Sequence, residues 1–161
     1  MRTLIIIGSS LLAALAFSTA AGAAGPQHFS FTEHDIFLDD TCSFPIVADF
    51  VSKNDITEFD NADGTVAALQ LHQTFVGTWT GNGVALTEND HEQTFVTFAG
   101  GTATQAKHVG LILHLAGPDG RLFQVAGQLV FTVVNGFDRD LLTAHGIAID
   151  FDPATYCPAF D

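Results

Sequence analysis

The sequence predicts an all-β domain, and three observations support that class. The chain is rich in Phe, Val, Thr and Gly and poor in Lys, Arg and Met, a composition that favours strands and turns over helices. Apolar and polar residues alternate along several stretches, which indicates strands with one buried face. No long stretch carries helical periodicity. We expect an antiparallel barrel of about eight strands, with a two-sheet β-sandwich as the alternative.

Residues 1–23 have the pattern of a secretory signal peptide. A basic residue is followed by an almost unbroken apolar run at 4–17 and then by small residues. The triplet Ala21-Gly22-Ala23 predicts cleavage before residue 24. The apolar run is shorter than the roughly 20 residues that span a bilayer. We therefore expect residues 24–161 to form a single secreted domain without a membrane span.

The strands expected after this segment follow from alternation and turn residues. In the strand at 66–80, Leu69, Leu71, Phe75 and Trp79 share one face, and polar side chains share the other. The segment Asp60-Asn-Ala-Asp-Gly-Thr65 before it is predicted to be a hairpin turn. The remaining expected strands are 44–51, 56–60, 84–87, 93–98, 108–115, 123–134 and 141–151, with polar connections at the residues between them.

The best-defined unit is the hairpin that spans residues 108–134. Its turn, Gly117-Pro-Asp-Gly120, combines proline at a position that suits a type I turn with glycine at the left-handed position of a bulge. A three-residue loop then makes one face wholly apolar. The predicted pairs are Leu115 with Phe123, Leu113 with Val125, Leu111 with Gly127 and Val109 with Leu129. The opposite face carries His108, Gly110, Ile112, His114, Gln124, Ala126 and Gln128.

Cys42 and Cys157 are the two cysteines of the chain. In a secreted protein they allow one intramolecular disulfide. A catalytic thiol needs a nearby base, and neither cysteine has a His or Lys close to it in the sequence. We expect a structural disulfide that joins the first and last segments of the domain.

Acidic residues strongly outnumber basic ones. The 18 Asp and Glu against 5 Lys and Arg give a formal net charge of −13. Nucleic acids and anionic membranes bind through clustered cationic side chains, so we expect no nucleic-acid partner. The acidity favours solubility outside the cell.

Four short segments carry a resemblance to small secreted β-proteins of actinobacteria, many of them uncharacterised. They are Cys42-Ser-Phe-Pro45, residues 59–64, Thr78-Trp-Thr-Gly81 and Cys157-Pro-Ala-Phe160. The strand count and the faces that bear Gln and His are also similar to the barrels of lipocalins and of allene oxide cyclase or dirigent proteins. The second resemblance implies a fold and carries no catalytic residue across.

Candidate metal and catalytic motifs are weak. His72, His114 and Glu92 make a conceivable two-histidine and carboxylate site, but no His-x-His spacing supports it, and we expect no metal and no cofactor. The segment at 60–64 fails the calcium-loop pattern. The Asp150/Asp152 and Asp138/Asp140 pairs need nothing more than solvation, and no serine stands in a Gly-x-Ser-x-Gly elbow.

Three functional hypotheses follow. The first is a non-enzymatic binding protein for a small apolar ligand or a protein partner, because several aromatic side chains lie on strand faces. The second is a small cyclase- or isomerase-like enzyme with a polar cluster in the barrel mouth, and the third is an envelope-associated structural or assembly protein. The candidate ligand-binding residues are His114, Gln124, Gln128 and Trp79.

Overall fold

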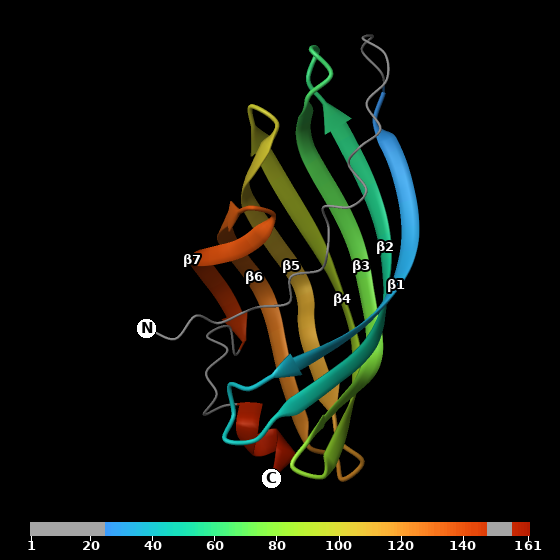
Figure 1. Cartoon of the computed structure of the whole chain (residues 1–161), viewed down its shortest axis with the longest axis vertical. Coiled ribbons are helices and arrows are strands. Elements are labelled where there is room, and N and C mark those ends of the chain that lie inside the picture. The colour runs from blue at the N-terminus through green and yellow to red at the C-terminus, as the bar shows by residue number, and fades with distance from the viewer. Residues whose placement is uncertain (1–24, 148–155) are drawn as a thin grey trace.

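Seven antiparallel strands form one sheet in chain order, so that each strand pairs with the next (Figure 1). This computed structural model describes residues 25–147 and 156–161. The strands are β1 (Gln27–Asp39), β2 (Ile46–Asp60), β3 (Val66–Gly81), β4 (Val84–Ala99), β5 (Thr102–Ala116), β6 (Leu122–Val134) and β7 (Phe137–Ile147). A short 3-10 helix spans Cys157–Phe160.

The all-β class and the antiparallel pairing are confirmed, whereas the eight-stranded barrel is not. Among the described residues β1 and β7 are the sheet edges and do not pair with each other, and all seven strands belong to one sheet rather than to a sandwich. Two pairs of predicted strands are single strands in the structure: 44–51 and 56–60 belong to β2, and 84–87 and 93–98 belong to β4. Strand β1 was not predicted, so the sheet has seven strands in place of eight. The signal segment and residues 148–151 of the last predicted strand lie outside the described residues.

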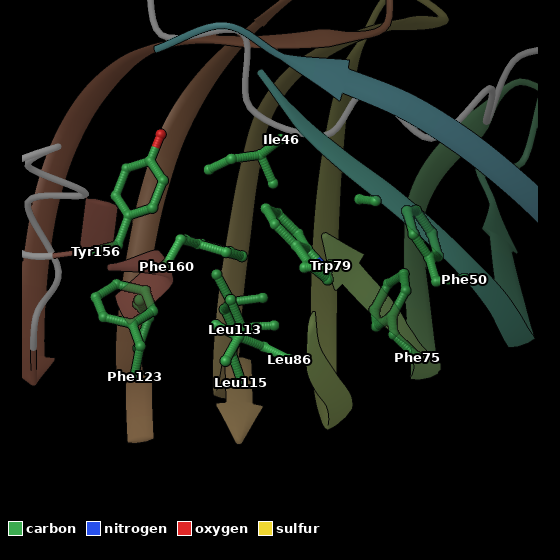
Figure 2. Close-up of a cluster of buried hydrophobic side chains, with 12 residues drawn as sticks. Ile46, Phe50, Phe75, Trp79, Leu86, Leu113, Leu115, Phe123, Tyr156 and Phe160 are labelled. Atoms are coloured by element: carbon green, nitrogen blue, oxygen red, sulfur yellow. The ribbon is translucent and has the colours of Figure 1, made fainter. Parts of the chain in front are cut away.

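One face of the sheet, called the inner face here, holds the core. Residues at alternate positions of β2, β3 and β4 are buried, and their neighbours in sequence are exposed, as period-2 alternation requires. Two apolar clusters occupy this face. The aromatic cluster (Figure 2) includes Ile46, Phe50, Phe75, Trp79, Leu86, Leu115 and Phe123. The aliphatic cluster consists of Ile56, Leu69, Leu71, Val96 and Ala106, with further apolar side chains packed against them.

The sheet curls, and the C-terminal helix fills the end where the curl brings distant strands together. The Tyr156 hydroxyl donates a hydrogen bond to Asp39 at the end of β1 (2.8 Å), and its ring lies 5.8 Å from that of Phe123 in β6. In a flat sheet these two strands would be about 24 Å apart, because neighbouring strands lie about 4.8 Å from each other. One tyrosine reaches both because the sheet is strongly curved (Figure 1).

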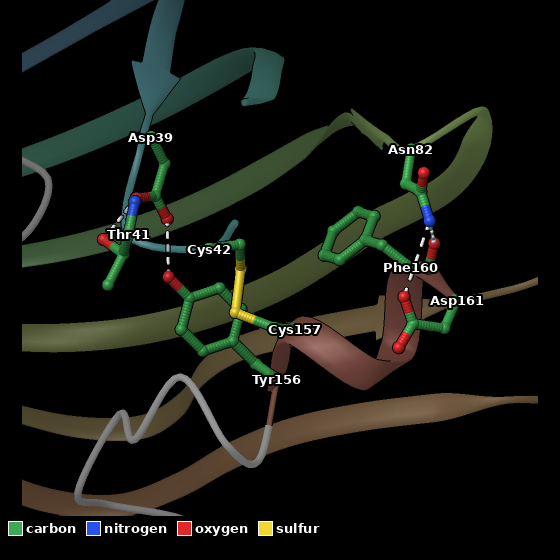
Figure 3. Close-up of a disulfide and its surroundings, with 8 residues drawn as sticks. All are labelled: Asp39, Thr41, Cys42, Asn82, Tyr156, Cys157, Phe160 and Asp161. Atoms are coloured by element: carbon green, nitrogen blue, oxygen red, sulfur yellow. Dashed lines mark hydrogen bonds between the residues drawn. A yellow bond between two sulfur atoms is a disulfide. The ribbon is translucent and has the colours of Figure 1, made fainter. Parts of the chain in front are cut away.

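The predicted disulfide between Cys42 and Cys157 is confirmed (Figure 3). Its Cα atoms lie 5.7 Å apart and its sequence separation is 115 residues. It holds the helix next to the β1–β2 connection. Phe160, which is fully buried, then completes the aromatic cluster.

Candidate functional site

A band of polar side chains crosses the inner face between the two apolar clusters. We call it the polar belt, and it consists of Ser52, Asn54, Gln73, Glu88, Asp90, Glu92, Thr94, His108 and Asp138. On β2, β3 and β4 the belt residues stand at the same inward alternation as the apolar residues on either side. Polar side chains at inward positions of a core are costly unless they are paired, so their partners decide what the belt does.

A β-bulge places His108 in the belt. The predicted pairs Leu115 with Phe123 and Leu113 with Val125 are confirmed, but the register then shifts by one residue at Ile112. His108 therefore lies opposite Leu129, whereas the predicted register placed Val109 opposite Leu129. The extra residue turns the remainder of β5 over, so His108 and His114 face opposite sides of the sheet. The prediction that they share a face is wrong.

His108 lies between two carboxylates from other strands. Its Nε2 lies 2.8 Å from Asp138 Oδ2, and its Nδ1 lies 3.3 Å from Glu92 Oε1 and 3.1 Å from Thr94 Oγ1. Burial opposes the charge on the ring, but the hydrogen bonds to Asp138 and Glu92 and the attraction of both carboxylates outweigh it and raise the pKa of His108 to about 10. The imidazolium thus joins β4, β5 and β7.

The hydrogen bonds continue from His108 across four further side chains. The Thr94 hydroxyl donates to Gln73 Oε1 (3.0 Å), and Gln73 Nε2 donates to Asn54 Oδ1 (2.8 Å). Asn54 Nδ2 then donates to Ser52 Oγ (3.1 Å). Seven of the nine belt residues, all except Glu88 and Asp90, therefore form one connected network from β7 to β2, and such a network orders its members.

Two buried carboxyl groups lie where the belt meets the aromatic cluster. Trp79 Nε1 donates to Glu88 Oε2 (3.0 Å), and the backbone N–H of His114 donates to Asp90 Oδ2 (3.2 Å). Burial and the negative charge of Glu88 raise the pKa of Asp90 to about 9, and burial also raises the pKa of Glu88. At neutral pH the Asp90 carboxyl is therefore protonated. Such a pair can donate a hydrogen bond or a proton at neutral pH.

Two carboxyl oxygens of the belt have no hydrogen-bond partner among the described residues, Asp90 Oδ1 and Glu92 Oε2. Glu92 Oε2 is buried and has no hydrogen-bond partner among the described residues, and 8% of its side chain is exposed. The positions level with Glu92 on β5, β6 and β7 are Gly110, Gly127 and Gly146. Their φ angles lie between 130° and 143°, and a Cβ on Gly127 would overlap the carbonyl oxygen of His145 in β7. No side chain from this row covers the carboxylate.

The four ligand-binding residues predicted from the sequence do not lie together. His114 and Gln124 are cross-strand partners, and Gln128 lies on the same face of β6 as Gln124. All three are half-buried on the face opposite the aromatic cluster. Trp79 is buried on the inner face, where it links the aromatic cluster to Glu88.

The conceivable metal ligands are likewise separated. His72 is exposed on β3 and, with His114, stands on the opposite face from Glu92. Within residues 25–147 and 156–161, no group of three or more His, Cys, Asp or Glu has the geometry to hold a metal ion. The segment at 60–64 forms a hairpin turn, as predicted, in which Asn61 N donates to Thr65 O (2.7 Å).

Comparisons of the chain with family models, with curated proteins and with solved structures find no match. The resemblance to actinobacterial secreted proteins and to lipocalin-like barrels therefore stays a prediction. No helix within the described part of the chain is long and apolar enough to cross a bilayer.

Proposed function

We propose that this protein is a secreted, non-enzymatic binding protein that takes up a small, largely apolar ligand on the inner face of its sheet. The polar belt is the observation that carries the proposal. A core that had only to be stable would favour apolar side chains there, because buried polar groups cost free energy unless every one is paired. Ligand sites combine apolar walls with a few polar groups that orient the ligand, which is the composition of this face.

Two further features support the proposal. The disulfide between Cys42 and Cys157 suits an oxidising compartment outside the cytosol. The belt also reaches solvent at the β7 edge, where 17% of the side chain of His108 and 17% of that of Asp138 are exposed. We propose that a small molecule enters the inner face from this edge.

Trp79 provides a direct assay because it is the only tryptophan of the chain and lies between the aromatic cluster and the belt. We expect small apolar compounds, titrated into the full chain with its disulfide intact, to change Trp79 fluorescence with a saturable curve. Chemical-shift mapping by NMR should then locate the bound compound on the inner face.

A matched pair of variants tests the location. Phe75→Leu removes an aromatic wall of the inner face, whereas Val76→Leu changes the next residue of β3, which is exposed on the outer face. We expect the first to weaken binding by about tenfold or more and the second to leave it unchanged. Titrations without any saturable change across the compound panel, or shifts confined to the outer face, would refute the proposal.

A further inference from the structure

We propose that the ligand of the polar belt is an organic amine, whose ammonium group binds the carboxylate of Glu92 while its apolar body packs against the aromatic cluster. This inference rests on the proposed function and adds the chemical class of the ligand. It follows from an unpaired acceptor, from the charge of the belt and from the spacing of its carboxylates.

The unpaired acceptor is Glu92 Oε2. The other oxygen of this carboxylate lies 3.3 Å from His108 Nδ1 and 3.3 Å from Thr94 Oγ1, so only Oε2 is free to receive a donor from a ligand. The side chain is more than nine-tenths buried, and the described residues supply no donor to this oxygen. A ligand that brings a donor to Oε2 removes the cost of that unmet hydrogen bond.

The charge of the belt favours a cationic donor. Asp90, whose pKa is raised to about 9 by burial and by the charge of Glu88, is protonated at neutral pH and adds no charge. Glu92 and Asp138 add two negative charges, against the single positive charge of His108. The four lysines and arginines of the described chain do not offset the excess. Lys53 and Arg139 are exposed, Lys107 lies over the Phe95 ring, and Arg121 pairs with Asp119. Buried charge without a counter-ion is unfavourable, and a bound cation would offset part of it.

The spacing of the carboxylates favours an organic cation over a metal ion. Glu88, Asp90 and Glu92 stand at every second position of β4, and such positions are about 7 Å apart. A metal ion needs several oxygens within about 2.0–2.6 Å of itself, and no group of three or more His, Cys, Asp or Glu side chains in the described residues provides them. An ammonium group needs only one or two acceptors.

Glycines lie beside Glu92, and aromatic side chains begin one inward position away along the sheet. The glycines level with it on β5, β6 and β7 bring no side chain over the carboxylate. Phe75 is the cross-strand partner of Asp90, one inward position further along β4, so aromatic surface begins about 7 Å from Glu92. A few carbon atoms between nitrogen and ring would span this distance.

The test compares 3-phenylpropylamine with 3-phenyl-1-propanol, which has the same body and no charge. Both are titrated into the full chain at pH 7 in 150 mM salt, which screens attraction by distant surface charges, with Trp79 fluorescence and calorimetry as readouts. We expect the amine to bind about tenfold more tightly or better, because a charge-assisted hydrogen bond forms in a buried site. Glu92→Gln should remove that preference, so that the amine and the alcohol bind this variant with equal affinity.

Two further variants control for charge and for folding. Asp49→Asn removes one negative charge from the outer face, where 55% of the Asp49 side chain is exposed, and should keep the preference. Glu92→Asp keeps the negative charge and should keep most of the preference for the amine. This variant guards against the possibility that Glu92→Gln folds poorly.

The outcomes separate the two proposals. Equal affinity for amine and alcohol overturns the amine inference and leaves the binding function standing. A preference that survives in Glu92→Gln also overturns it, as does failure of the amine to bind while other apolar compounds do. Failure of every compound overturns both proposals.

Discussion

Raising the pH from 7 to 9 should destabilise the folded protein because two belt groups hold protons that the unfolded chain has released. The pKa of Asp90 rises to about 9 in the folded state through burial and the nearby charge of Glu88, against about 3.9 in an unfolded chain. The pKa of His108 rises to about 10 despite its burial, through its hydrogen bonds to Asp138 and Glu92, against about 6.5. For both groups the folded pKa is the higher one, so stability is lost as the pH increases.

The size of the effect follows from proton linkage. Between about pH 6.5 and pH 9 the folded state binds two more protons than the unfolded state, and each proton changes the free energy of unfolding by about 1.4 kcal/mol per pH unit. The free energy of unfolding should therefore fall by about 5 kcal/mol from pH 7 to pH 9. This is comparable to the whole stability of many domains.

Urea unfolding followed by Trp79 fluorescence at pH 6, 7, 8 and 9 measures this slope. Asp90→Asn replaces the protonated acid with a neutral amide of the same shape, so it should halve the slope and make the variant more stable than the wild type at pH 8. His34→Gln changes an exposed histidine on β1 and should leave the slope unchanged. A free energy of unfolding that is flat or rises between pH 7 and pH 9 would refute the reasoning, as would an unchanged slope in Asp90→Asn.

Three other substitutions test the features that hold the fold. Replacing both Cys42 and Cys157 by Ser removes a cross-link over 115 residues, and the chain-entropy model gives a loss of about 5 kcal/mol; an unchanged urea midpoint would contradict a structural role. Gly127→Ala places a Cβ onto backbone of β7 and should cost about 2 kcal/mol or more, at least twice the loss for Gly64→Ala in an open turn, measured by thermal unfolding. His108→Phe leaves two buried carboxylates without their cation and should cost about 3–5 kcal/mol at pH 6 by urea unfolding. Stability equal to the wild type would show that the ion triad is not formed.

The strands that could be predicted from the sequence are those whose inner face is apolar throughout a long segment. β3 was predicted within one residue, because Leu69, Leu71, Phe75 and Trp79 alternate with polar residues. The turn at 117–120 and the first pairs of the β5–β6 hairpin were also predicted, since proline and glycine specify that turn and Gly117 N donates to Arg121 O as expected (2.9 Å).

The polar belt is the reason that β2 and β4 were each predicted as two separate strands. Several belt residues were predicted to lie in connections between strands, because polar runs are typical of loops. They are Ser52 and Asn54 in β2, and Glu88, Asp90 and Glu92 in β4. A signal was nevertheless present, since Phe50 and Ile56 have the same alternation as the polar residues between them. Apolar residues that keep their alternation across a polar gap indicate one continuous strand with a polar interior.

The bulge at Ile112 could not have been predicted in the same way. A single extra residue reverses every inward and outward position that follows, and the alternating pattern around residues 108–115 suits both registers. The prediction therefore placed His108 with His114 on one face. The interactions that favour the observed register come from Glu92 and Asp138, which belong to other strands and are not visible in the local sequence.

The position of the disulfide has a consequence for the order of folding. Strands β1 to β7 pair only with their neighbours in the chain, so each hairpin can form as soon as its two strands have emerged. The aromatic cluster, in contrast, is completed by Tyr156 and Phe160, and the cross-link requires Cys157. The aromatic cluster is therefore complete only when residues 156–160 arrive. Until then the nascent chain remains a curved set of hairpins that is open at one end, and oxidation of the two cysteines is the step that fixes the finished molecule.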